Sequence, residues 1–172
     1  MVVTIFGSSR PKQGESEYTL AYDLGAALAH EGITVCNGGF AGVMEASARG
    51  AREAGGTTIG VTFTALGPRS QNPWIDQVVQ EESLIDRAMK LMELGDAYVV
   101  LKGGTGTLLE LSMAWELINK GLMKEKPIVI LGPFWDGVVD TLNEELAWEG
   151  LERCTRYVKK AKTVGEVVSL LR

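Results

Sequence analysis

Three glycine clusters contain the residues best suited to hold a ligand. Each cluster follows a short apolar run and precedes a helical pattern, at Gly7–Ser9, Gly38–Gly42 and Gly103–Thr107. Free backbone N–H groups at a helix N-terminus bind anions, and glycine allows a ligand to approach the backbone closely. With three glycines and two threonines, the third cluster predicts a phosphate-binding turn. The candidate ligand-binding residues are Gly7, Ser8, Ser9, Gly38, Gly39, Gly103, Gly104, Thr105, Gly106 and Thr107.

A tight turn from strand to helix also needs glycine when no ligand is present. For the cluster that begins at Gly38, this second explanation is as good as the first.

Known nucleotide-binding fingerprints narrow the kind of phosphate ligand. The segment Gly104–Leu109 fails the G-x-G-x-x-G pattern at its last position, and Asn37 stands where a dinucleotide site has an acidic residue. The P-loop pattern G-x-x-x-x-G-K-[ST] does not occur in the chain. We therefore expect a mononucleotide or a sugar phosphate. Its negative charge would be attracted by cations expected in or near the crevice, namely Arg10, Lys12, Arg87 and Lys102.

Several other chemistries lack the residues that they need. His30 is the only histidine and falls at the end of a predicted helix, so a Ser-His-Asp triad or a histidine-rich metal site is not expected. Cys36 and Cys154 have no C-x-x-C spacing, and Cys36 fits the core of a strand. No metal and no cofactor are expected.

The elements that position these residues follow from the apolar pattern. Strands are predicted at Val2–Phe6, Ile33–Cys36, Thr57–Val61, Ala97–Leu101 and Pro127–Leu131. Helices are predicted at about 16–30, 42–53, 83–93, 107–120, 135–148 and 164–171, and a polar loop at Leu66–Trp74. Uninterrupted apolar strands that alternate with helices indicate an α/β fold. We expect one nucleotide-binding domain over residues 1–172, a Rossmann-like doubly wound parallel sheet of about six or seven strands flanked by helices.

In such a sheet all three clusters lie at the carboxyl edge of the strands. The first strand lies beside the strand that begins the second half, so the turns at Gly7 and Gly103 flank the topological switch point. Ligands of doubly wound sheets bind at this point.

Composition excludes several classes of protein. The 172 residues carry 17 Lys and Arg against 22 Asp and Glu, a net charge of −5, which disfavours nucleic-acid or membrane-surface binding. The N-terminus lacks the pattern of a signal peptide, and no apolar stretch approaches about 18 residues. Two cysteines are too few for a disulfide framework, so a cytoplasmic location is expected.

The segment Asp96–Glu110 resembles the LOG family, the cytokinin riboside 5′-monophosphate phosphoribohydrolases once labelled possible lysine decarboxylases. The family motif P-G-G-x-G-T-x-x-E matches here except that Lys102 replaces the proline. The family's Arg-Lys pair maps to Arg87 and Ala88. The segment Gly38–Met44 resembles the family's G-G-x-x-G-L-M segment, and the next residue, Glu45, stands where the family usually has glycine.

This resemblance implies hydrolysis of the N-glycosidic bond of a nucleoside 5′-monophosphate, with AMP or a cytokinin riboside monophosphate as substrate. It implies Glu110 and Arg87 as the catalytic residues. Glu110 would stabilise the oxocarbenium-like ribosyl cation and orient water, and Arg87 would hold the ligand or assist electrostatically.

Both residues have a purely structural explanation. Thr107 and Glu110 fit a capping box, S/T-x-x-E, in which the glutamate only caps its helix. Arg87 falls with Asp86, Lys90 and Glu93 on the polar face of an amphipathic helix, where it would be solvated.

A second resemblance points to binding without cleavage. The segments Gly42–Ala46 and Gly50–Gly56 are similar to the molybdenum-cofactor carrier proteins, a sister branch of the same superfamily. A non-catalytic nucleotide or cofactor carrier is therefore the alternative function. The resemblance also implies a homo-oligomer, a dimer or larger, for which Met113 and Trp115 are either interface or core residues.

Overall fold

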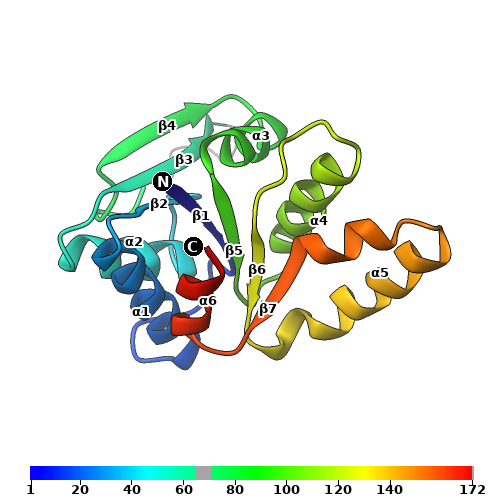
Figure 1. Ribbon diagram of the computed structural model, residues 1–172. Coiled ribbons are helices and arrows are strands. Elements are labelled where there is room, and N and C mark those ends of the chain that lie inside the picture. Colours follow the sequence, from blue (N-terminus) through cyan, green and yellow to red (C-terminus); the bar gives the residue numbers. More distant parts are fainter. Residues whose placement is uncertain (65–70, 172) are drawn as a thin grey trace.

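A parallel seven-stranded sheet forms the centre of the computed structural model, which describes residues 1–64 and 71–171 (Figure 1). The strand order in this described part is β4-β3-β2-β1-β5-β6-β7. The strands are β1 Val2–Phe6, β2 Thr34–Asn37, β3 Thr58–Phe63, β4 Gln77–Glu81, β5 Ala97–Val100, β6 Ile128–Leu131 and β7 Val158–Ala161. The order places β1 beside β5, so the predicted α/β Rossmann-like fold and its switch point are confirmed.

Helices cover both faces of the sheet (Figure 1). One face carries α1, α2 and α6, and the opposite face carries α3, α4 and α5. The helices are α1 Ser16–His30, α2 Val43–Glu53, α3 Leu84–Leu94, α4 Thr105–Asn119, α5 Asp136–Trp148 and α6 Val164–Leu171. Short 3₁₀ turns lie at Pro133–Trp135 and Glu152–Tyr157.

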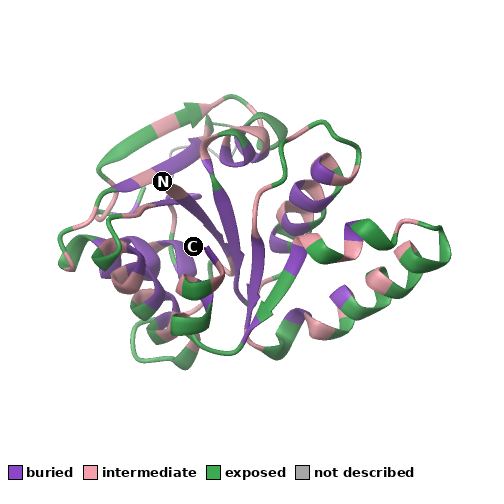
Figure 2. Ribbon diagram, in the orientation of Figure 1, coloured by how far each residue is buried: buried purple, intermediate pink, exposed green. Residues whose placement is uncertain are grey.

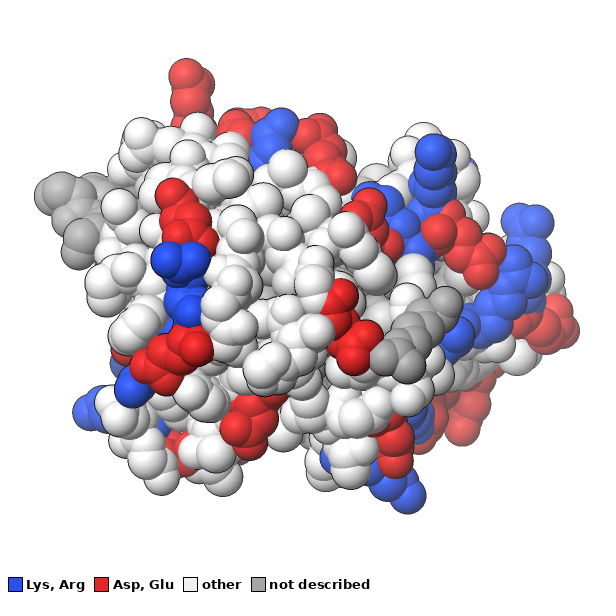
Figure 3. Space-filling view, turned by 60° about the vertical axis from the view of Figure 1, so that its left-hand side comes forward, with Lys and Arg blue, Asp and Glu red and all other residues white. Residues whose placement is uncertain are grey.

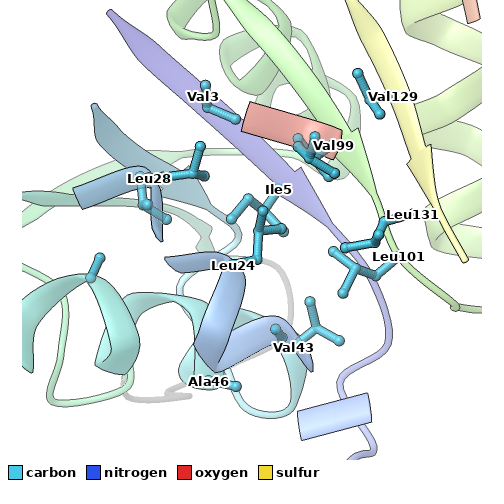
Figure 4. Packing of buried hydrophobic residues seen from close by; sticks show 14 of the residues in the cluster. Val3, Ile5, Leu24, Leu28, Val43, Ala46, Val99, Leu101, Val129 and Leu131 are labelled. Atoms are coloured by element: carbon cyan, nitrogen blue, oxygen red, sulfur yellow. The ribbon is translucent and has the colours of Figure 1, made fainter. Parts of the chain in front are cut away.

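Strands β5 and β6 are buried throughout, and β1 and β2 are buried after their first residue (Figure 2). Side chains of β5 alternate between two apolar clusters: Val99 packs with Leu24 of α1, and Tyr98 packs with Leu111 of α4. Figure 4 shows the first of these clusters. Both faces of a strand must be apolar when both are covered, which explains the uninterrupted apolar runs.

The two edge strands were not predicted individually. In β4, Gln77 and Val78 are exposed, and in β7 only Val158 and Ala161 are buried. An edge strand with one solvated side lacks the apolar run by which the central strands are recognised. Residues 66–70 of the predicted polar loop Leu66–Trp74 lie outside the described residues.

The side chain of Trp115 belongs to the core of the chain. It is 3% exposed, and its indole N–H donates to the carbonyl of Cys154 at 3.0 Å. Met113 is half-buried against the same cluster. The core alternative therefore holds for Trp115, which is not available as an interface residue.

Within the described residues no helix has the length and apolarity needed to cross a bilayer. On the face drawn in Figure 3, acidic and basic side chains are interspersed around a largely uncharged centre.

Glycines bring α1 and α2 into close contact. A Cβ on Gly25 would overlap the carbonyl of Ser47, and a Cβ on Gly50 would overlap that of Tyr22. We expect Gly50→Ala to force the helices apart and to lower the free energy of unfolding by about 1–3 kcal/mol, measured by urea denaturation. Gly137→Ala, at an exposed site in α5 with open space around it, is the control and should be neutral or stabilising by up to ~1 kcal/mol. Equal stabilities of the two variants would contradict this account of the helix packing.

Candidate functional site

A cavity of about 440 Å³ lies where β1 and β5 end. Its walls come from the turn after β1, the first residues of α2 and α4, and side chains of α3 and α4. Two hydrogen bonds join these turns: Ser8 N–H donates to the carbonyl of Lys102 at 3.1 Å, and Val43 N–H donates to that of Ser8 at 2.9 Å. The predicted site residues that line this cavity are Gly7, Ser8, Ser9, Gly38, Arg87, Gly104, Thr105, Gly106, Thr107 and Glu110.

The N-terminus of α4 supplies hydrogen-bond donors to the cavity. The helix begins at Thr105, and its first internal bond runs from Leu108 N–H to the carbonyl of Gly104 at 3.0 Å. The N–H groups of Thr105, Gly106 and Thr107 therefore have no partner within the helix. Together with the positive end of the helix dipole, they can bind a phosphate group.

The glycines in these turns differ in whether the fold leaves room for a Cβ atom. A Cβ on Gly7 would come within 2.7 Å of Val43, so the fold itself requires glycine there. At Gly104 and Gly106 no atom outside the local chain lies within 4 Å of the added Cβ. The fold leaves space for a side chain at both positions, which a ligand that contacts the helix N-terminus would occupy.

Two predicted ligand-binding residues do not line the cavity. Gly39 has a φ of +76°, and its N–H donates a hydrogen bond to the side-chain oxygen of Asn37 at 2.8 Å. Gly103 is covered by the side chain of Thr107. Both glycines shape the turns that carry the neighbouring lining residues.

Only two of the four cations predicted near the crevice line the cavity. Arg87 and Arg10 line the cavity, whereas Lys12 and Lys102 do not. Lys102 Nζ instead pairs with Glu17 at 2.9 Å.

Arg87 is the charged residue most constrained by the fold. Its side chain is 9% exposed, and its Nε–H donates to the carbonyl of Val61 at 2.8 Å. The guanidinium carbon lies 5.8 Å from the ring centre of Phe40 and 5.7 Å from that of Phe63. The alternative explanation, a solvated Arg87, is wrong, because the helix places this side chain between two rings.

Glu110 lies beside this guanidinium and lines the same cavity. Its Oε1 lies 3.5 Å from Arg87 Nη1, and its side chain is 13% exposed. Burial raises the pKa of Glu110 from 4.5 to about 7, and Arg87 opposes this shift. The capping-box explanation is wrong, because α4 begins at Thr105 and places Glu110 in its second turn, beyond the first-turn position that such a glutamate needs.

Sequence reasoning missed residues that hold this pair. Phe63 and the carbonyl of Val61 come from β3, which carries no motif. Met44, whose Sδ lies 4.0 Å from Arg87 Nη2, ends the segment Gly38–Met44 that resembles the family, but no role was assigned to it.

Two departures from the family pattern lie away from the cavity. Glu45 turns towards α1 and accepts a hydrogen bond from Tyr18 Oη at 3.1 Å. Ala88 is buried in the core. Among the described residues, no group of three or more His, Cys, Asp or Glu side chains could hold a metal ion.

Comparisons with known proteins agree with this architecture. A family model described as LDcluster4, the SLOG cluster4 family, matches residues 1–168. A protein of Mycobacterium tuberculosis named cytokinin riboside 5′-monophosphate phosphoribohydrolase is 35% identical over 145 residues, 82% of this chain and 76% of the relative. A protein of the same name from Rhodococcoides fascians is 32% identical over 133 residues, 75% of this chain and 66% of the relative.

Solved structures include relatives with another role. The X-ray structure of TM1055, a structural-genomics target, is 30% identical with a TM-score of 0.76, covering 98% of this chain and 96% of that one. The molybdenum cofactor carrier protein of Chlamydomonas reinhardtii is 25% identical with a TM-score of 0.74, covering 98% and 93%.

The close approach of Arg87 to Gly38 gives a prediction. A Cβ on Gly38 would overlap the guanidinium and come within 2.7 Å of Met44 Sδ. We expect Gly38→Ala to displace Arg87 from Glu110 and to lower the free energy of unfolding by about 1–3 kcal/mol. Gly106→Ala, at an open position, should leave stability unchanged or higher but weaken the binding of AMP. Urea denaturation and calorimetric titration would measure both effects, and a Gly38→Ala variant as stable as the parent would contradict the packing argument.

The raised pKa of Glu110 predicts how stability depends on pH. The folded state holds the proton more tightly than the unfolded state, so the contribution of Glu110 to the free energy of unfolding decreases from about pH 4.5 to about pH 7. Glu110→Gln removes this dependence. Relative to the parent, the variant should gain stability between pH 5 and pH 8, by up to about 3 kcal/mol in urea denaturation. The control Glu116→Gln, an exposed change on the same helix, should show no such gain. A parallel pH dependence of parent and Glu110→Gln would refute the shift.

Proposed function

The chain belongs to the SLOG cluster4 family, and from this premise we propose that it is a nucleotide phosphoribohydrolase. The proposed reaction cleaves the N-glycosidic bond of a nucleoside 5′-monophosphate, of the AMP or cytokinin riboside monophosphate type. Water adds to the anomeric carbon, and the products are the free base and ribose 5-phosphate. The observation that carries the proposal is the buried pair of Glu110 and Arg87 in the same cavity as the first-turn N–H groups of α4.

In this proposal the N-terminus of α4 binds the 5′-phosphate through the N–H groups of Thr105, Gly106 and Thr107. Gly7, Ser8 and Ser9 form the facing wall. Fixing the phosphate orients the ribose beside Glu110, and orientation of this kind lowers a barrier by several kcal/mol.

Glu110 then acts in its ionised form. Cleavage builds positive charge on the ribose ring, and a carboxylate in a poorly solvated cavity stabilises that charge and orients the attacking water. The departing base takes up a proton as the bond to the anomeric carbon breaks. Arg87 keeps part of the carboxylate population ionised, because its charge lowers the pKa of Glu110 against the effect of burial.

The carrier remains the second candidate function. Its support is the similarity to the molybdenum cofactor carrier protein of Chlamydomonas reinhardtii. A carrier would use the same backbone donors to bind a nucleotide-like ligand and would release it intact.

Release of the base distinguishes the two functions. We expect incubation with AMP to yield adenine and ribose 5-phosphate, detected by chromatography, and Glu110→Gln to lower the rate at least about 100-fold while AMP still binds. Glu116→Gln, on the exposed side of the same helix, is the matched control and should keep the parent rate. Tight binding with quantitative recovery of intact nucleotide would establish the carrier instead.

The rate should also follow the ionisation of Glu110. Because the carboxylate is the active form, kcat/KM for AMP should rise with pH and level off above about pH 7. Steady-state rates between pH 5 and pH 9 would show this. A rate that falls over the same interval would exclude the ionised carboxylate as the active form.

A homo-oligomer and a cytoplasmic location complete the proposal. Sedimentation at micromolar concentration should give a particle larger than the 18.6 kDa of one chain. A particle of that mass alone would contradict the predicted assembly.

A further inference from the structure

A second cavity, of about 390 Å³, lies between α1 and the turn that follows β6. The floor of this cavity is apolar and consists of Val43, Leu101 and Leu131. These three residues belong to the core cluster of Figure 4, where they lie close together at one end of the cluster. Leu20 and the half-exposed ring of Phe134 form part of the cavity walls. An apolar cavity of this size at the carboxyl edge of a doubly wound sheet is typical of a small-molecule site.

A smaller cavity, of about 300 Å³, lies next to both the second cavity and the candidate site. It shares Ser8 and Arg10 with the candidate site, and Glu17 and Lys102 with the second cavity. The three cavities are therefore neighbours along the carboxyl edge of the sheet, and together they are called the trough.

The strand order fixes the direction of this trough. Gly38, which touches Arg87, follows β2, Lys102 follows β5, and Phe134 follows β6. The donors of α4 lie just beyond β5, between the Glu110–Arg87 pair and the second cavity. When a ribose lies beside Glu110 and its phosphate binds α4, a group in the second cavity must be attached through that phosphate.

The charges of the smaller cavity suit a second phosphate group. Arg10 and Lys102 contribute two cations, and Glu15 and Glu17 contribute two carboxylates. Glu15 accepts the backbone N–H of Lys12 at 2.8 Å, so one of its carboxylate oxygens is paired with the turn. Glu17 is held by Lys102 Nζ, and an arriving phosphate oxygen can take its place on that ammonium group.

The outer end of the trough suits a planar or apolar group. Lys102 Nζ lies 5.9 Å from the centre of the Phe134 ring, and the lysine lines both the smaller cavity and the second one. A planar group would stack on the exposed face of that ring.

We propose that the trough binds a nucleoside 5′-diphosphate whose second phosphate carries an aromatic or apolar group. The proposal rests on the proposed function, because Glu110 defines the ribose end. The missing G-x-G-x-x-G fingerprint applies to a pyrophosphate bound at the first helix of the fold, whereas here the phosphate donors belong to α4. A ligand of this length is therefore compatible with the sequence.

The test compares probes that differ only beyond the first phosphate. AMP, ADP, ADP-ribose and NAD⁺ are titrated by calorimetry into the full chain carrying Glu110→Gln, which limits turnover. We expect NAD⁺ to bind at least about tenfold more tightly than AMP, and ADP-ribose, which lacks the nicotinamide ring of NAD⁺, to lie between them.

Two variants locate the added affinity. Phe134→Ala removes the ring and Leu20→Trp fills the cavity, so each should reduce the advantage of NAD⁺ over AMP to less than about threefold while AMP binding is unchanged. The control is Trp148→Ala. Trp148 is an exposed aromatic residue at the end of α5 and lines no part of the trough, so this variant should keep the full advantage of NAD⁺ over AMP.

The outcomes separate this inference from the proposed function. If the parent chain hydrolyses AMP but NAD⁺ and AMP bind equally, the trough proposal fails alone. If the two cavity variants weaken AMP and NAD⁺ by the same factor, the second cavity is not the source of the affinity, and the proposal also fails. If AMP is neither bound nor hydrolysed, both proposals fail together.

Discussion

The contact between Arg87 and Glu110 constrains the rest of the site. Two ions taken out of water are costly, and each tolerates burial because the other stands 3.5 Å away. The guanidinium needs further support, which it receives from the carbonyl of Val61 and from two aromatic rings. Its position also decides that residue 38 is glycine, since a Cβ there would overlap the guanidinium. Residues from two further parts of the chain, 38–40 and 61–63, therefore serve one ion pair.

Topology brings the backbone donors to this pair. Parallel strands all end at the same edge of the sheet. The strand order reverses between β1 and β5, so no helix lies between the turns at Gly7 and Gly104. Hydrogen bonds from Ser8 to Lys102 and from Val43 to Ser8 fix the turns to one another. The cavity is thus a consequence of the sheet order, and side chains determine only its chemistry.

The sequence predicted the parts of the molecule whose signal is local. Uninterrupted apolar runs identified β1, β5 and β6, because strands covered on both faces have no polar alternation. Edge strands such as β4 have one solvated side, so their pattern resembles a loop. The glycine turns were found, but which glycines face the cavity depends on three-dimensional contacts, and Gly39 and Gly103 serve the turns. Helix periodicity alone favoured a solvated Arg87, and only the family resemblance assigned this residue to the site, because a polar helix face can meet a cavity as readily as solvent.

The energetics of the ion pair bear on the choice between hydrolase and carrier. Phosphate binding through α4 uses backbone groups, so it requires neither Glu110 nor Arg87. For binding alone, apolar side chains of similar volume at both positions would be neutral or more stable, since buried ion pairs seldom recover the cost of desolvation. A carboxylate with a pKa near 7 is, by contrast, suited to chemistry near neutral pH. A carrier has no use for a charge kept at such a cost beside its ligand, whereas a glycosidic hydrolase needs that charge where positive charge develops on the sugar. The retained pair therefore favours catalysis.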